Sequence, residues 1–227
     1  MKILGFYPDT IAARVRESPM TPQIPTLRQS LGVGAIGFGV IGAAMAAMVA
    51  LGGERLQQRL GPATIDAVRA ALFILLGGAV LSRLVIGPGR VLRFYIVFAV
   101  ALCLHAAAWT LAYFQMHNDL GNWLGLFFGA VILGLTLATA FDAPRQLIRT
   151  VLVLFITRAA GFFGARFLHD LLPGSAGALM SSVLIAVGLG TGLGYALYAC
   201  QEPVRRRLAP IGPAAATPPP PSPAALP

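Results

Sequence analysis

Six long runs of apolar residues, separated by short polar connections, dominate the pattern of this chain. At about 1.5 Å of rise per residue, a helical run of about 20 residues crosses a hydrocarbon layer about 30 Å thick. Backbone groups cannot stay unpaired in lipid, so each run is predicted to be an α-helix. The predicted spans are Leu31–Leu51, Ala67–Ile86, Val91–Phe114, Trp123–Phe141, Leu147–Leu168 and Ala178–Cys200.

This pattern predicts an all-α fold, a polytopic integral membrane bundle of six transmembrane helices over residues 29–200. Residues 1–28 are expected to be an arm, with a short helix over Thr10–Ser18 that lies on a membrane surface. Residues 52–66 are expected to be a loop. Residues 201–227 contain four successive prolines, which cannot continue a helix, and we expect a disordered proline-rich tail.

The connections on one side of the predicted bundle share a proline followed within three to five residues by an arginine. This recurrence favours three helical hairpins in the same orientation. A duplicated unit accounts for it, and so does interface chemistry, because proline suits the first turn of a helix and arginine suits headgroup depth. We predict that four of these arginines bind lipid headgroups: Arg28, Arg93, Arg149 and Arg205.

Composition supports the membrane interpretation. Of 227 residues, 57% are hydrophobic and 11% are charged, whereas soluble domains carry about 25% charged residues. The net charge of +9 comes from arginines dispersed at helix ends, so we expect membrane lipids as partners and no nucleic acid. Twelve of the 17 basic residues lie on the side of both termini and four on the other side. The positive-inside rule therefore places both termini in the cytoplasm of a multi-pass protein, which we expect in a bacterial inner membrane.

Small residues recur every four positions in the first, fourth and sixth spans, where they let helices approach closely. The sixth span carries them on two faces and is predicted to be central, whereas the second, third and fifth spans are predicted to meet lipid. A glycine-rich span can also act as a hinge. The predicted packing residues are Ala35, Gly39, Ala43, Gly188, Gly190, Gly192 and Gly194.

Arg158 is the strongest chemical signal, because it lies eleven residues after Leu147 and ten before Leu168. A guanidinium at that depth costs about 2.5–3.5 kcal/mol on insertion scales. No Asp or Glu lies within a predicted span, so no ion pair at that depth is available within one chain. Arg158 is therefore expected to point into the bundle. Two interpretations remain open: a site for an anion, a carboxylate or a lipid headgroup, and a structural arginine bonded to carbonyls or to a neighbouring subunit.

His105 lies at a depth comparable to Arg158, with Trp109 one turn further on the same helical face. We predict that these three residues form a substrate-binding set, in which a neutral His105 accepts a hydrogen bond from Arg158. Two other roles for His105 stay open, a hydrogen-bonded packing residue and a proton relay.

The remaining residues give no support for an enzyme or a cofactor. His117 with Asp119, and His169 with Asp170, would form a metal site only if their loops meet, and we expect no metal. Two functions remain. The first is a small transporter or channel for an anionic or polar solute. The second is a non-catalytic accessory subunit of a larger membrane complex. A homo-oligomer or such a complex is the expected assembly.

Overall fold

The computed structural model describes residues 6–18, 24–87, 90–172 and 174–209, of which 51–58, 60, 62 and 90 are described through the backbone alone. Six of its helices are long and apolar enough to cross a membrane, and the described residues include no strand. The predicted all-α polytopic bundle is therefore confirmed. The helices are α1 (Pro8–Glu17), α2 (Leu27–Leu60), α3 (Pro62–Ser82), α4 (Arg90–Met116), α5 (Asp119–Ala140), α6 (Leu147–Leu171), α7 (Ser175–Cys200) and α8 (Glu202–Leu208), with a 3-10 turn, η2 (Pro144–Gln146), before α6.

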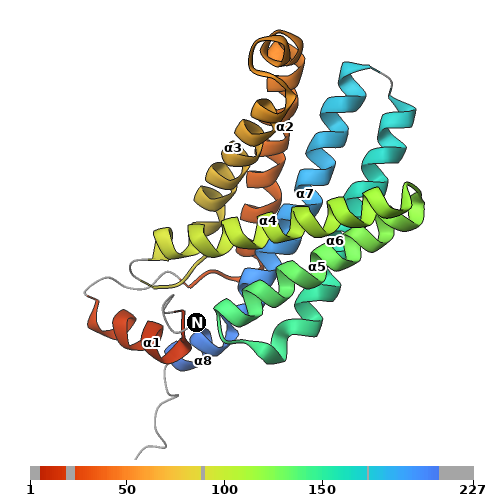
Figure 1. Cartoon of the computed structure of the whole chain (residues 1–227). Helices are drawn as coiled ribbons and strands as arrows, with labels where there is room; N and C mark the ends of the chain where they lie inside the picture. Colours follow the sequence, from red (N-terminus) through yellow and green to blue (C-terminus); the bar gives the residue numbers. More distant parts are fainter. Residues whose placement is uncertain (1–5, 19–23, 88–89, 173, 210–227) are drawn as a thin grey trace, which may run out of the picture.

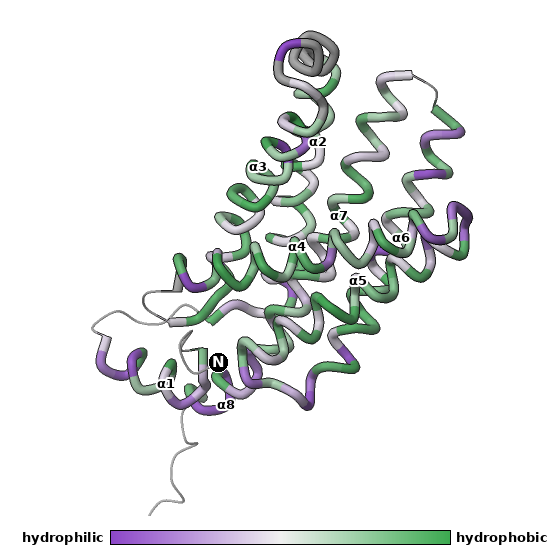
Figure 2. The backbone as a smooth tube through the Cα atoms, viewed as in Figure 1, coloured by the Kyte–Doolittle hydropathy of each residue, from purple (hydrophilic) through white to green (hydrophobic). Residues whose placement is uncertain are grey.

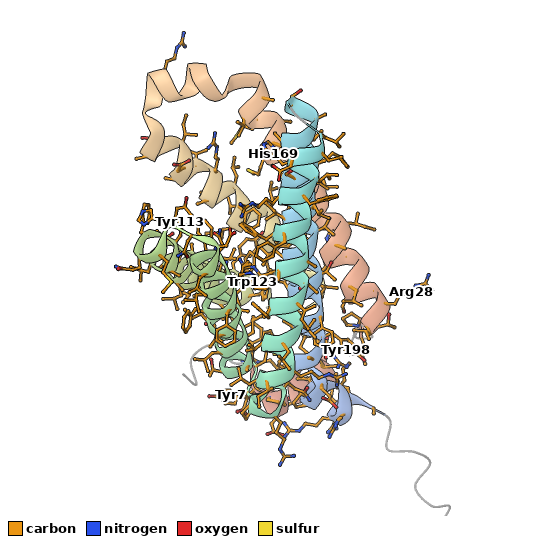
Figure 3. All side chains as sticks on the ribbon, turned by 90° about the vertical axis from the view of Figure 1, so that its right-hand side faces the viewer. Tyr7, Arg28, Tyr113, Trp123, His169 and Tyr198 are labelled. Carbon is orange, nitrogen blue, oxygen red and sulfur yellow. The ribbon has the colours of Figure 1, made fainter. Side chains whose placement is uncertain are left out.

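The long helices form three consecutive hairpins, α2–α3, α4–α5 and α6–α7 (Figure 1). The hairpins are not arranged alike. The α4–α5 hairpin runs steeply across the other two, and its tip does not reach the level of their tips. Figure 3 gives the same arrangement from the side, with Tyr113 near the tip of α4–α5 lying well below His169 near the end of α6.

Helix α7 is packed between α2 and α6 through glycine residues. A Cβ atom on Gly34 of α2 would overlap the backbone of Gly190 in α7, and a Cβ atom on Gly194 would overlap the carbonyl of Ser30. On the other side of α7, a Cβ atom on Gly161 of α6 would lie 3.1 Å from the Cα of Gly188. We call these contacts of α7 with α2 and α6 the glycine seam. Small residues make such close approach possible.

The surroundings of α6 differ from the sequence expectation. Helix α6 was expected to meet lipid, yet only one side of it carries exposed apolar residues such as Ile148, Leu152 and Ile156. Its other side packs on α7, where the Ser181 hydroxyl donates to the carbonyl of Ala165 at 2.9 Å.

The remaining predicted packing residues lie in different surroundings. Gly192 faces Leu154 and Thr157 of α6. Gly39 faces the side chain of Val187, while its neighbours Ala35 and Ala43 are only partly buried. The closest approach of α2 to α7 instead uses Gly34 and Gly42. The row of Gly34 and Gly42 is interrupted by Phe38, so the spacing of small residues favoured the uninterrupted row of Ala35, Gly39 and Ala43.

Both ends of the described chain meet at one end of the bundle, together with the α3–α4 and α5–α6 connections (Figure 1). Gln201 is fully buried there. Its side-chain oxygen accepts from the N–H of Ile86 at 2.7 Å, and its nitrogen donates to the carbonyls of Leu84 and Leu197, each at 3.0 Å. These bonds fasten the α3–α4 connection to the end of α7.

Helices α1 and α8 pack on each other at this same end, and Figure 2 shows hydrophilic residues gathered along both. Ile11 and Val15 of α1 are buried, and Asp9 pairs with Arg207 of α8 at 2.6 Å. The short amphipathic helix predicted near the N-terminus is thus present. Its apolar side is covered by protein.

Three boundaries differ from the sequence expectation. Helix α2 continues to Leu60 and α3 begins at Pro62, so the predicted loop over residues 52–66 is helical except at the break around Gly61. Gly61 has a φ of +78°, a conformation that glycine adopts without strain, which permits the turn. Helix α8 occupies the start of the predicted tail, and residues 210–227 lie outside the described residues.

Candidate functional site

Arg158 of α6 and His105 of α4 are in contact inside the bundle. Nη1 of Arg158 lies 3.3 Å from Nδ1 of His105, and the His105 side chain is buried. A guanidinium can only donate, so the imidazole Nδ1 accepts and the ring carries its proton on Nε2. The described ion pairs join other arginines to Asp9, Asp66, Asp119 and Glu202. Within the described residues, Arg158 therefore has a neutral partner and no carboxylate.

Helix α5 lies between α4 and α6, and its glycines make the contact possible. A Cβ atom on Gly129 would overlap the His105 ring and lie 3.0 Å from Nη1 of Arg158. One turn away, a Cβ atom on Gly125 would lie 2.7 Å from Trp109. Two ring side chains four residues apart on α4 thus lie over two glycines four residues apart on α5. Because Gly129 has no side chain, His105 of α4 can reach Arg158 of α6 past α5.

Trp109 takes part in this packing and lies beside the polar pair. Its ring stacks on Tyr113 at a centroid distance of 5.3 Å. Trp123 of α5 packs on Phe163 of α6, with their ring centroids 4.3 Å apart. Figure 3 shows Trp123 beside α6. The structure brings together Arg158 and His105 of the predicted substrate-binding set, and it places Trp109 against Gly125 and Tyr113.

A cleft of about 430 Å³ opens between α2, α3, α4 and α7, and His105 forms part of its wall. Most of the lining is apolar. Its polar members are Arg69, Cys103, His105 and Ser182. We call this space the lateral cleft. The volume falls within the range of about 300–1,000 Å³ that is usual for small-ligand sites. Cys103 is exposed there.

The four arginines predicted to bind headgroups lie in different surroundings. Arg28 is exposed and points away from the bundle (Figure 3). Arg93 is partly buried. The Arg149 guanidinium lies 5.8 Å from the ring of Tyr195.

Arg205 is held by α7. Its guanidinium lies 3.7 Å from the centroid of the Tyr198 ring and donates to the Tyr198 carbonyl. Burial lowers the pKa of this guanidinium, and the nearby Tyr198 and Glu202 act in the opposite direction. This contact anchors α8 to the end of α7.

The His and Asp residues near the hairpin tips form other contacts. Asp119 pairs with Arg166 at 2.6 Å, and both side chains are largely exposed. His117 packs against Tyr113 and Phe114. In the part of the chain that the structure describes, no three metal-ligating side chains come together.

Sequence reasoning missed Gly129 as a site residue and Arg69 as a cleft residue. The signal for Gly129 was available, because Gly125 and Gly129 share the four-residue spacing of Trp109 and His105. Arg69 gave no comparable signal, since it lies near a predicted helix end where arginine is common.

The fold and the polar contact define a polytopic membrane protein with a cationic side chain inside its bundle. No protein-family model, characterised protein or solved structure that we compared with the chain matches it.

Proposed function

We propose that this protein is a small transporter or channel for an anionic or polar solute, with Arg158 and His105 forming its polar site. The observation that supports this proposal is a guanidinium whose charge is not balanced by a carboxylate in the described part of the chain. Arg158 bonds to a histidine at 3.3 Å and has no carboxylate partner in the described part of the chain. A charge at this depth is costly unless it is compensated, and an anionic solute supplies the compensating charge.

Flux through proteoliposomes tests this proposal. Efflux of chloride, inorganic phosphate and acetate should be measured for the wild type and for Arg158→Leu. We expect the leucine variant to insert normally and to lose flux, and Arg158→Lys to restore only part of it, because an ammonium does not reproduce the planar fork of a guanidinium. Arg166→Leu, an exposed position on the same helix, is the matched control. Unchanged flux in Arg158→Leu would show that this site is not used.

The alternative is a non-catalytic accessory subunit that packs against a larger membrane complex. The glycine seam gives it less support than the sequence suggests, because Gly188, Gly190 and Gly194 are already covered by α2 and α6. Purification in mild detergent separates the two functions. A discrete homo-oligomer supports transport, whereas a stoichiometric larger complex, together with an active Arg158→Leu variant, supports the accessory role.

We also propose that the end of the bundle carrying α1 and α8 faces the cytoplasm, most simply of a bacterial inner membrane. Support comes from the surplus of basic residues at that end. Single cysteines at Asn118 and Arg145, both exposed, should be introduced after Cys103 and Cys200 are replaced by alanine. Residue 118 should react with an impermeant maleimide from outside intact cells, and residue 145 only after lysis. Equal labelling of both positions would contradict the topology.

A further inference from the structure

The wall of the lateral cleft is apolar along most of its length. Met45 of α2, Phe73 and Ile74 of α3, Leu102 of α4 and Leu189 of α7 all line it. A free inorganic anion would leave this surface uncovered. An acyl chain covers it at no polar cost, because hydrocarbon and these side chains are equally apolar.

One charged residue, Arg69, stands at the cleft. Its Nη1 donates to Asp66 at 3.2 Å, and the Asp66 side chain is 72% exposed. Its Nε is enclosed by protein and has no hydrogen-bond partner among the described residues. An enclosed donor on a charged group is costly to leave unpaired. A ligand cannot reach Nε itself, but the side chain is 26% exposed, and Nη2 has no hydrogen-bond partner among the described residues and is not enclosed.

The depth of Arg69 suits a lipid headgroup. It lies seven residues into α3 from Pro62, about 10 Å along the helix axis at the helical rise. This is the region where long basic side chains reach toward headgroups while their stems stay among apolar groups. Phosphate oxygens are acceptors that match the fixed fork of a guanidinium.

We propose that the lateral cleft binds a membrane phospholipid, with one acyl chain along the apolar wall and a phosphate oxygen accepting from Nη2 of Arg69. The proposal goes beyond transport of a solute at Arg158, since Arg158 does not line the cleft. His105 is the residue common to both regions, so the acyl chain would cover the ring on its cleft side. Covering the ring excludes water and strengthens the polar contact behind it.

Retention of lipid by the purified full-length protein tests the proposal. The protein should be extracted in mild detergent, and bound phospholipid should be measured by native mass spectrometry. Arg69→Gln removes the phosphate contact, and Ala106→Phe fills the cleft. Two matched controls lie outside the cleft lining: Arg59→Gln at the same end of the bundle, and Ala107→Phe, the exposed neighbour of Ala106 on α4.

We expect wild type and both controls to retain phospholipid, and both cleft variants to retain at least about tenfold less, the loss that corresponds to one charge-assisted contact. Adding back phosphatidylglycerol should raise the melting temperature of wild type more than diacylglycerol does, and inorganic phosphate should not displace the bound lipid. Equal retention in Arg69→Gln and wild type would overturn the phosphate contact. Equal retention in Ala106→Phe, or occupation of the cleft by a second copy of the chain that Ala106→Phe dissociates, would overturn the cleft as the lipid site. A melting-temperature profile like that of wild type shows that each variant is folded.

Discussion

The glycine seam and the lateral cleft are two regions of the same bundle in which the helices pack differently. In the seam, backbone approaches backbone at Gly34 and Gly190, and no space remains. At the cleft, bulky side chains such as Phe73 of α3 and Leu102 of α4 line a space of about 430 Å³ that stays open. Apolar helices gain nothing from leaving lipid, so they associate where shape permits close contact and otherwise leave grooves. The seam therefore stabilises the fold, and the cleft is free to hold a ligand.

The largest expected effect comes from adding a side chain to the seam. Gly34→Leu places its Cβ against the backbone of Gly190, which cannot move aside as a side chain can. We expect destabilisation of at least about 3 kcal/mol, the upper part of the range for overpacked cores. The measurement is the yield of monodisperse protein in detergent and its melting temperature.

Gly32→Leu is the matched control, because a Cβ atom on Gly32 of the same helix would meet nothing within 4 Å. It should be neutral or stabilising by about 0.5–1 kcal/mol, since glycine is a poor helix former. If both variants behave alike, the seam is not the close contact described here.

A second test concerns the bonds that fasten the cleft side of the bundle to the seam. Gln201→Leu leaves the N–H of Ile86 and the carbonyl of Leu84 without their side-chain partner. Each buried group left unpaired costs about 1–3 kcal/mol, so for the two groups we expect a loss of about 2–6 kcal/mol. Amide hydrogen exchange at Ile86 should accelerate more than at Gly190. Gln29→Leu, at an exposed position, should change neither property.

The fold was predictable from sequence to the extent that length and hydropathy determine it. Six runs long enough to cross the bilayer gave the six helices, and the depth of Arg158 and His105 in their runs predicted that they could meet. The crossing of the α4–α5 hairpin was not predictable, because hydropathy is nearly the same on every side of a helix in lipid. Helix α8 was missed because the four successive prolines, which lie beyond Leu208, led us to expect disorder over the whole stretch from residue 201, and proline is well tolerated in a first turn such as that of α8.

The site was predictable in part for a similar reason. The depth of a residue in the membrane can be counted along its helix, so the contact between Arg158 and His105 could be predicted. Which residues of neighbouring helices face each other cannot be counted in this way, because it depends on which rows of small residues form the helix contacts. For this reason Arg69 at the cleft did not emerge from the sequence, although the four-residue spacing of Gly125 and Gly129 offered a signal for Gly129 at the contact.

The two native cysteines allow the accessibility of the lateral cleft and of the glycine seam to be compared without a substitution. Cys103 is exposed at the lateral cleft, whereas Cys200 is buried at the end of the seam, with its sulfur 4.0 Å from Oγ1 of Thr150. Because reaction requires access to the thiol, we expect a membrane-permeant maleimide to modify Cys103 at least about ten times faster than Cys200. Peptide mass spectrometry after timed quenching measures both rates in one sample. Similar rates would show that the cleft is closed, or the seam open, in detergent.

The smallest expected effect has the opposite sign, and it concerns a hydroxyl in the seam. The Ser30 hydroxyl oxygen is enclosed and has no hydrogen-bond partner among the described residues, while its carbonyl faces Gly194. Ser30→Ala removes an unsatisfied polar group and leaves only a small gap, so we expect stabilisation of about 0.5–1 kcal/mol. This corresponds to a rise in melting temperature of about 1–4 °C for a chain of this size. At the cleft, Ser182 already donates to the carbonyl of Ala178 at 2.9 Å, so Ser182→Ala should change stability by less than about 0.5 kcal/mol. A lower melting temperature for Ser30→Ala than for Ser182→Ala would mean that the seam hydroxyl has a partner after all, and that polar bonding as well as shape holds α2 to α7.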